Sequence, residues 1–247
     1  MKDFFSSISH DYLKFRPDYP SELFDYINLN VKDRSNALDC GTGNGQLAFE
    51  ISNYFTNVYA IDISQNQITE AIKRDNIFYS LCNSESTQFQ DNFFDLIAVA
   101  QAIHWFDFDR FYSEVYRIIK PDGIFVATGY GLFRTDTEID RLLRYFNDEI
   151  IGNYWDKVRH YIDESYKTIP FPFNEIHVPE FESKFYWTFD QVIGYLNTWS
   201  CVKTYFEIHD RNPLDIIYNQ LKNLWGKEQA RKVIFPIFTR LGRANRL

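Results

Sequence analysis

The chain has 247 residues, of which 45% are hydrophobic, 24% charged and 19% aromatic. This composition is typical of one globular domain with a sizeable core, and no run of about 18 apolar residues predicts a membrane-spanning helix. The net charge of −8 disfavours nucleic acid as a partner, because an acidic surface repels phosphate backbones.

The N-terminal part of the chain, residues 1–34, is expected to form short helices interrupted at Arg16-Pro17-Asp18-Tyr19-Pro20. Residues 35–131 alternate short apolar runs with helical patterns, which indicates βαβ units and a parallel sheet. Apolar residues at helical spacing between 108 and 119 predict a helix that ends at Pro121-Asp122-Gly123. The predicted strands of this cofactor-binding core are Asn36–Cys40, Asn57–Ile63, Phe78–Cys82, Phe94–Ala100 and Ile124–Gly129.

The second half of the chain predicts an insertion followed by the rest of the sheet. Residues 132–180 carry helical patterns that end at Pro170-Phe171-Pro172, and we expect them to form a helical cap after the fifth strand. Residues 181–247 are expected to complete the sheet. Their predicted strands are Phe181–Thr188 and Val233–Thr239, with helices around Phe189–Cys201 and Pro213–Trp225. The fold class is therefore α/β, a Rossmann-like, doubly wound and mostly parallel seven-stranded sheet in a single domain, 1–247.

The three cysteines, Cys40, Cys82 and Cys201, lie far apart and form no CxxC pair. Neither a disulfide framework nor a metal site is predicted. Their apolar neighbourhoods indicate buried thiols in a reducing compartment, and the N-terminus lacks the apolar stretch of a signal peptide. We therefore expect a cytoplasmic protein.

A glycine-rich turn, Gly41-Thr42-Gly43-Asn44-Gly45, follows the first predicted strand and precedes a helix. Glycines let the backbone turn tightly and let a ligand approach it closely. Gln46 stands where the third glycine of a GxGxxG dinucleotide fingerprint would be, and no Lys-Ser or Lys-Thr follows. The turn therefore predicts neither a pyrophosphate site of the dinucleotide type nor a P-loop.

Two acidic residues accompany this turn. Asp39 lies two residues before the first glycine, where it could receive a cationic amino group. Asp62 ends the next predicted strand, at the distance from the loop expected of a carboxylate that accepts both ribose hydroxyls. Each acid alone could instead be a helix N-cap or a solvated turn residue. Together with the turn they predict a nucleoside site.

The chain resembles class I S-adenosylmethionine-dependent methyltransferases over nearly its whole length. The segment from Asp39 to Gly45 is similar to the family's first motif, and Asp62 to its ribose-binding acid. Cys82-Asn83-Ser84-Glu85 resembles the segment around the adenine, with Asn83 where Asp is commoner. Four segments of the chain resemble the subgroup that contains trans-aconitate methyltransferase. They are His104-Trp105-Phe106-Asp107, the RPxYP segment at 16–20, Gly152-Asn153-Tyr154-Trp155 and Thr198-Trp199-Ser200.

This resemblance implies S-adenosylmethionine as the cofactor. Arg16 could pair with the methionine carboxylate, or it could lie in solvent while the neighbouring prolines shape the chain. The cofactor-binding residues that we expect are Tyr12, Arg16, Asp39, Gly41, Gly43, Gly45, Asp62, Ile63, Asn83, Ser84 and Gln101.

The acceptor is expected to be a small molecule methylated at a carboxylate or hydroxyl oxygen. A carboxylate needs no general base, whereas a hydroxyl or amine loses a proton to a base, and His104 is the candidate. A structural hydrogen bond is the alternative role for His104. Arg134, with Arg159 behind it, is expected to pair with an acceptor carboxylate, although either arginine could instead be a surface residue, Arg159 more readily than Arg134. The expected substrate-binding residues are His104, Trp105, Tyr130, Arg134, Trp155 and Trp199, although the aromatic ones could simply pack in the core.

Two other functions remain open from the sequence. One is an NAD-dependent oxidoreductase on a similar sheet, and the other is a catalytically silent cofactor-binding or regulatory domain. The chain has no Asn-Pro-Pro-Tyr or Asp-Pro-Pro-Tyr segment after the fourth strand, which many methyltransferases of DNA and exocyclic amines carry. The sequence determines neither the acceptor's identity nor the oligomeric state.

Overall fold

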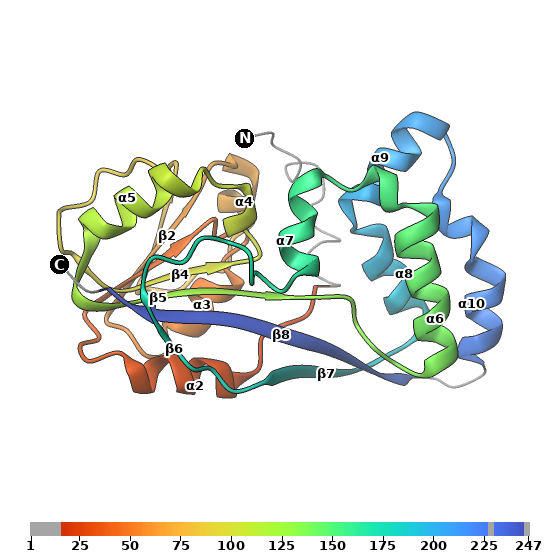
Figure 1. Ribbon diagram of the computed structural model, residues 1–247, viewed down its shortest axis with the longest axis horizontal. Coiled ribbons are helices and arrows are strands. Elements are labelled where there is room, and N and C mark those ends of the chain that lie inside the picture. The colour runs from red at the N-terminus through yellow and green to blue at the C-terminus, as the bar shows by residue number, and fades with distance from the viewer. Residues whose placement is uncertain (1–15, 227–229, 245–247) are drawn as a thin grey trace.

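An eight-stranded twisted sheet runs through the computed structural model, which describes residues 16–226 and 230–244 (Figure 1). The strand order is β3-β2-β1-β4-β5-β8-β6, and β7 also pairs with β8. The strands are β1 (Asn36–Cys40), β2 (Asn57–Asp62), β3 (Ile77–Leu81), β4 (Phe94–Ala100), β5 (Ile119–Tyr130), β6 (Asn174–Ile176), β7 (Phe181–Trp187) and β8 (Arg231–Arg243).

The first five strands pair in parallel, whereas β8 is antiparallel to β5, β6 and β7. The chain starts in the middle of the sheet and winds outward in both directions. The order therefore reverses between β1 and β4, and a crevice forms beyond the carboxyl ends of these strands. The predicted doubly wound, mostly parallel sheet is confirmed.

The outer edge of the sheet contains one strand more than predicted. The backbone of Arg134 bridges to Ile234 on one side of β8, and Lys184 of β7 faces Ile234 on the other. Strands β6 and β7 thus follow each other along the same side of β8, and the sheet is seven strands wide. The short strand Asn174–Ile176 was missed because three residues show no periodicity.

Strand β5 starts five residues earlier than predicted, at Ile119. Its pairing with β4 shifts between the Phe94–Ile119 and Leu96–Ile124 pairs, so the Pro121-Asp122-Gly123 segment is a bulge inside the strand. Asp122 adopts a left-handed backbone with φ of 63°. The turn residues were recognised correctly, but their place in the element was not.

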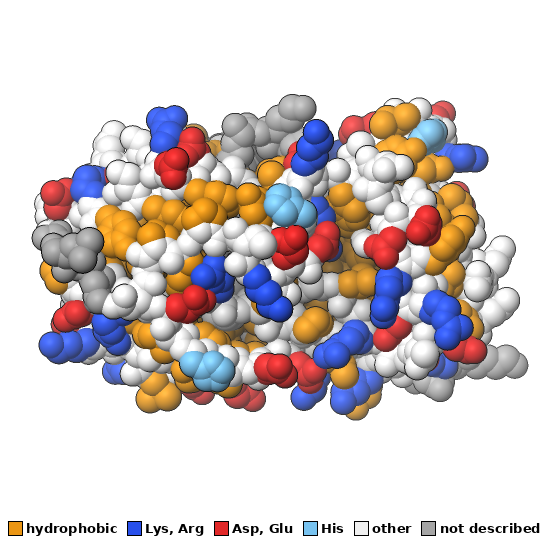
Figure 2. Space-filling model, in the orientation of Figure 1, with side chains coloured by type: hydrophobic (Ala, Val, Ile, Leu, Met, Phe, Trp, Pro, Cys, Tyr) orange, Lys and Arg blue, Asp and Glu red, His pale blue; other side chains and the backbone are white. Residues whose placement is uncertain are grey.

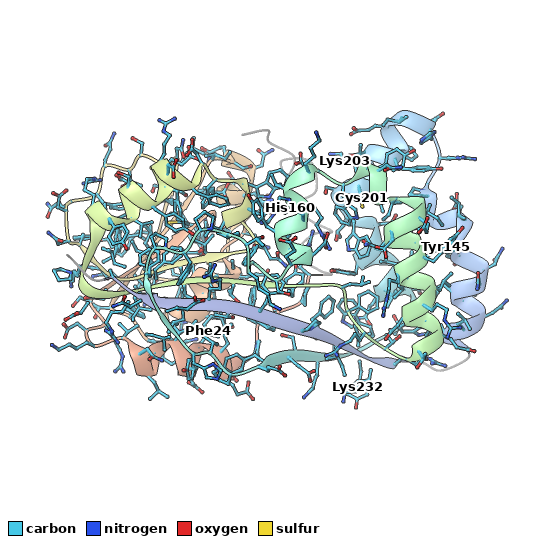
Figure 3. The ribbon with its side chains drawn as sticks, viewed as in Figure 1. Phe24, Tyr145, His160, Cys201, Lys203 and Lys232 are labelled. Carbon is cyan, nitrogen blue, oxygen red and sulfur yellow. The ribbon has the colours of Figure 1, made fainter. Side chains whose placement is uncertain are left out.

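Apolar side chains of the central strands alternate between two cores, one on each face of the sheet. Leu96 and Ala98 of β4 pack into the core beside α2 and α3, while Ile97 and Val99 pack into the core beside α5. Phe24 of α2, labelled in Figure 3, lies between this helix and the sheet. The helices beside the sheet are α2 (Ser21–Asn30), α3 (Gln46–Ile51), α4 (Gln65–Glu70) and α5 (Phe108–Ile118).

The remaining helices form a lobe beside the sheet, on the right in Figure 1. It draws on two stretches of the chain, because α10 packs against α6 and α9 packs against η3. The sequence placed only 132–180 in a cap, whereas the structure adds the helices between β7 and β8. They are α6 (Thr137–Tyr145), the π-helix η2 (Phe146–Ile150), the short helices η3 (Gly152–Tyr154), η4 (Lys157–Arg159) and α7 (His160–Asp163), then α8 (Phe189–Asn197), α9 (Ser200–His209), η5 (Pro213–Ile216) and α10 (Tyr218–Trp225).

Cys40 and Cys201 are buried, as predicted, whereas Cys82 is half-buried; all three are free thiols. Cys201 lies inside the helical lobe (Figure 3). Within the described residues, no group of three or more His, Cys, Asp or Glu side chains could hold a metal ion. Over the same residues, each helix is too short or too polar to cross a membrane.

Candidate functional site

The turn after β1 holds Gly41, Gly43 and Gly45 in left-handed backbone conformations, with φ values of 68°, 55° and 86°. The N–H groups of Gly41 and Thr42 donate to the carbonyl of Ile61, at 2.9 and 3.0 Å, and tie the turn to the end of β2. A Cβ atom on Gly41 would lie 2.7 Å from the Cβ of Ala102, just after β4. Glycine is therefore needed where the turn passes the neighbouring strand.

Gly45 has a structural role at the start of α3. A Cβ atom there would lie 2.1 Å from the hydroxyl of Tyr79, which donates to the carbonyl of Ile72. Gly45 does not line the cavity described next. The third glycine of the turn thus lets β3 and α3 pack closely, and its predicted contact with a ligand stays a prediction.

A cavity opens beyond the carboxyl ends of β1, β2, β4 and β5. Seven of the predicted cofactor-binding residues line it, namely Arg16, Asp39, Gly41, Gly43, Asp62, Ile63 and Gln101. The sequence did not single out its other lining residues as contacts, among them Tyr19, Thr42, Asn44, Ser64 and Gln67. The structure therefore brings together Asp39 and Asp62, which are 23 positions apart, and Gln101, which follows the end of β4.

Asp39 is completely buried at the end of β1. Its Oδ2 accepts a hydrogen bond from the Thr42 hydroxyl at 2.6 Å. Its Oδ1 has no partner of normal geometry among the described residues, although the Ala48 backbone N–H also acts to lower the pKa. Burial raises the pKa of Asp39 from 3.8 to about 7, and the nearby charge of Asp62 adds to the rise. A cation bound at Oδ1 would offset the free-energy cost of burying the charged carboxylate.

Asp62 is held at the end of β2 by two backbone hydrogen bonds. Oδ2 accepts from the N–H of Gly43 and Oδ1 from the N–H of Ser64, both at 2.8 Å. Each carboxylate oxygen retains one lone pair that a hydroxyl could donate to. This geometry suits a ligand with two neighbouring hydroxyl groups.

Three buried polar atoms around the cavity have no hydrogen-bond partner among the described residues: Asp39 Oδ1, Asn44 Nδ2 and Gln101 Oε1. Buried polar atoms are normally paired, so three of them in one cavity indicate a polar ligand. Gln101 also adopts a left-handed backbone with φ of 53°, which is strained for a residue with a side chain. The donors and acceptors present therefore fit a nucleoside with an amino acid portion.

A second pocket adjoins this cavity. The two share Arg16, Gln101, Trp105 and Tyr130, so these four residues border both spaces. Trp155, Tyr195 and Trp199 of the helical lobe, with His104 and Arg159, form much of its wall. The rings of Trp155 and Trp199 lie 5.5 Å apart, centroid to centroid. The pocket therefore forms between the sheet and the lobe.

Residues 38–127 match the family description "methyltransferase domain". A Dictyostelium discoideum protein named as a methyltransferase is 31% identical over 244 residues, covering 96% of this chain and 93% of its own. The chain belongs to the class I S-adenosylmethionine-dependent methyltransferases. The cofactor of this methyltransferase is therefore S-adenosylmethionine.

Solved structures agree with this assignment. A structure from Anaeromyxobacter dehalogenans, named as a type II methyltransferase, matches the chain with a TM-score of 0.86 and 36% identity, covering 93% of this chain and 98% of its own. Phosphoethanolamine N-methyltransferase 2 from Haemonchus contortus, solved with phosphomonomethylethanolamine and S-adenosylhomocysteine, shares the fold, with a TM-score of 0.51 and 18% identity over 98% of this chain and 58% of its own. The resemblance to the trans-aconitate subgroup stays a prediction.

His104 lies in the short helix η1 (Ile103–Trp105) of the methyltransferase and lines the second pocket. Its ring is buried, and Nδ1 lies 3.1 Å from the Tyr166 hydroxyl. Burial, with a further contribution from the positive charge of Arg159, lowers the pKa of His104 from 6.5 to about 3. A pKa this low makes the neutral ring a weak base, and the contact with Tyr166 favours the alternative of a hydrogen-bonding role; the predicted general-base role stays a prediction.

The structure does not place Arg134 at the second pocket, and its predicted contact with the acceptor stays a prediction. Its guanidinium forms an ion pair with Glu182 at 2.9 Å, and the side chain is 56% exposed. Arg134 lines neither the cofactor cavity nor the second pocket, because its backbone pairs with Ile234 and carries the side chain along β8.

Arg159, the second choice, lines the pocket instead. Its Nε donates to Asp163 at 3.0 Å, and its guanidinium carbon lies 4.2 Å from the ring centre of Trp155. Among the described residues this is the only hydrogen bond of the guanidinium, so its two terminal nitrogens remain available to an anion.

Besides Gly45, three predicted cofactor contacts are not among the residues that line the cavity. Asn83 is exposed and accepts the N–H of Glu85 at 2.9 Å, and neither it nor the buried Ser84 lines the cavity. Tyr12 lies outside the described residues. Of the expected acceptor residues other than Arg134, all line the second pocket. Tyr195 was missed because it lies on a late helix without a recognisable motif.

Proposed function

We propose that this methyltransferase transfers the methyl group of S-adenosylmethionine to a small molecule, at a carboxylate or hydroxyl oxygen, in the second pocket. The observation that supports this proposal is the junction of the two pockets at Arg16, Gln101, Trp105 and Tyr130. An acceptor in the second pocket would approach the cofactor cavity at these four residues, which border both spaces. In-line displacement requires such an approach.

In the first cavity, different residues would bind different groups of the cofactor. Asp39 Oδ1 would bind the ammonium group, and Asp62 would accept hydrogen bonds from the ribose hydroxyls. Arg16 donates to the Tyr130 hydroxyl at 3.0 Å and lies where it could pair with the carboxylate. The bound cofactor supplies an electrophilic methyl group on a sulfonium. Aromatic side chains at the junction exclude water from the reacting atoms.

The second pocket favours a carboxylate acceptor over a hydroxyl. His104 is neutral and poorly basic. The side chain of Asp156, the carboxylate among the described lining residues, accepts the N–H of Val158 at 3.1 Å as the N-cap of η4. A carboxylate is already ionised near neutral pH and needs no base. Arg159 offers it a counter-charge.

Macromolecular acceptors fit the surface less well. The net charge is −8, and basic and acidic side chains intermingle on the face drawn in Figure 2, which shows no broad basic area. We therefore keep a small molecule as the acceptor. A cytoplasmic location also stays a prediction; a mouse relative, 30% identical over 127 residues, is named as the mitochondrial arginine-hydroxylase NDUFAF5.

Calorimetry with S-adenosylmethionine, S-adenosylhomocysteine and NAD, on the wild type and Asp62→Ala, tests the cofactor site. We expect the first two ligands alone to bind, and the variant to bind them at least about tenfold more weakly, since it loses two hydrogen bonds. Binding of NAD instead would support the oxidoreductase alternative and refute the proposal.

Methyl transfer from radiolabelled cofactor to a panel of small carboxylic acids, alcohols and amines tests the acceptor site. Arg159→Gln should raise KM for acids at least about tenfold, because the charged hydrogen bonds are lost. Arg134→Gln is the matched control and should leave KM unchanged. Equal effects of both substitutions would contradict the assignment of Arg159, and methylation of amines alone would contradict an oxygen acceptor.

A further inference from the structure

Tyr166 is buried beside His104, and unlike His104 it does not line the second pocket. It follows α7 in the chain, and both Ser165 and Tyr166 adopt left-handed backbones, with φ of 56° and 60°. The Tyr166 N–H donates to the carbonyl of Tyr161 at 2.7 Å, and its ring packs edge-on against Phe238, with centroids 4.8 Å apart. These contacts fix the hydroxyl beside the imidazole, 3.1 Å from Nδ1.

The direction of this hydrogen bond follows from the burial of both groups. Tyr166 is 0% exposed, and among the described residues His104 is the only hydrogen-bond partner of its hydroxyl. If the hydroxyl accepted a hydrogen bond from a protonated Nδ1, its own hydrogen would be buried without an acceptor, which is costly. Burial also raises the pKa of Tyr166, so the hydroxyl keeps its proton. The hydroxyl therefore donates to Nδ1.

A neutral imidazole that accepts at Nδ1 carries its proton on Nε2. Nε2 makes no hydrogen bond to a described residue, and the ring lines the second pocket. We infer that Tyr166 locks His104 in the Nε2-protonated tautomer, so that His104 positions the methyl acceptor as a hydrogen-bond donor. Tyr166 is then a positioning residue that acts through His104.

This inference rests on the proposed function for its substrate and adds a selection rule. A donor at Nε2 favours an acceptor molecule that presents a lone pair, such as a carboxylate oxygen. An N–H or O–H group pointing at Nε2 would meet another hydrogen. No proton is transferred to His104 in the reaction, because Nδ1 is occupied and Nε2 is already protonated.

Nitrogen-15 NMR of the histidine side chains tests the tautomer without any acceptor. The chain has five histidines, and the His104 signals are those lost in His104→Gln. We expect a protonated Nε2 and an unprotonated Nδ1 that stay unchanged from pH 5 to 8. Tyr166→Phe should give a mixture of tautomers. Tyr112→Phe is the matched control, because its buried hydroxyl donates to Pro170 and not to His104.

Kinetics of three variants then separate a donor from a base. Glutamine keeps an N–H donor near the position of Nε2 but has no basic nitrogen. We expect His104→Gln to stay within about threefold of wild type in kcat/KM and His104→Ala to lose about tenfold, the effect of one ordinary hydrogen bond. Tyr166→Phe should lose less than His104→Ala and should act mainly on KM.

A protonated Nδ1 in the wild type, or unchanged tautomers in Tyr166→Phe, would overturn the inference. The inference would also fail if His104→Gln were as impaired as His104→Ala and if kcat rose with pH in the wild type but not in His104→Gln. If the wild type binds the cofactor but methylates none of the tested acids, the proposed acceptor class fails, while the NMR result still decides the tautomer.

Discussion

Replacing Asp39 by asparagine should stabilise the cofactor-free protein above neutral pH and nearly abolish cofactor binding. The folded state raises the pKa of Asp39 from 3.8 to about 7, mainly through burial. The folded protein therefore retains a proton that the unfolded chain releases, and the free energy of unfolding falls as pH rises from about 4 to about 7. At about 1.4 kcal/mol per pH unit, the loss is about 4 kcal/mol, and it is complete above pH 7.

The asparagine side chain of the Asp39→Asn variant cannot ionise, so the variant avoids this loss. Its amide can still accept from Thr42, but it places an N–H near the former Oδ1, where it lacks an acceptor and costs about 1–3 kcal/mol. We expect a net gain of about 1–3 kcal/mol at pH 8 and a net loss of about 1–3 kcal/mol near pH 4, where the wild type is protonated. Urea unfolding at several pH values measures both.

Cofactor binding should change in the opposite direction. Loss of a buried charged partner for the ammonium group costs about 2–5 kcal/mol, so the affinity should fall at least about 30-fold at pH 8. In the wild type only the ionised form of Asp39 binds well, so its affinity should be about tenfold weaker at pH 6 than at pH 8. The variant should show no such dependence in calorimetry.

Asp95→Asn is the matched control, at the opposite end of the sheet. Asp95 is buried in β4, pairs with Lys120 at 2.6 Å and accepts the N–H groups of Ser35 and Asn36. Its loss should destabilise the protein by about 3 kcal/mol and leave cofactor affinity unchanged. Similar destabilisation of both variants at pH 8, or a stability difference between wild type and Asp39→Asn that is independent of pH, would refute the reasoning.

Two further substitutions test the local structure around the site. Gly45→Ala should cost about 2–4 kcal/mol in urea unfolding, because φ is 86° and the new Cβ would lie 2.1 Å from the Tyr79 hydroxyl. Tyr79→Phe should recover part of this loss, and a cost below about 0.5 kcal/mol would contradict the predicted clash. Asp107→Ala should cost about 1 kcal/mol, since Asp107 caps α5 by accepting the N–H of Arg110 at 3.2 Å. Calorimetry should show an unchanged cofactor affinity; a large loss would indicate that Asp107 contacts the ligand.

The sequence by itself determined the parallel strands of the sheet and the two acids at their ends, and the family resemblance added the cofactor. Strand and helix periodicities are local, so they could be read without knowing the tertiary structure. The carboxyl ends of neighbouring parallel strands meet at one edge, which is why Asp39 and Asp62 were placed in one site before their contacts were known. The role of Gly41 in a tight turn could also be predicted, because its left-handed backbone conformation favours glycine over other residues.

Only the tertiary structure decided how the second pocket is built. The sequence does not distinguish Arg134 from Arg159. In the structure Arg134 donates a hydrogen bond to Glu182, 48 positions away, whereas Arg159 in the lobe lines the second pocket. The basicity of His104 depends on its burial and on Arg159. Its protonated nitrogen depends on Tyr166, 62 positions away. These properties arise from contacts between distant segments, and local patterns contain no record of them.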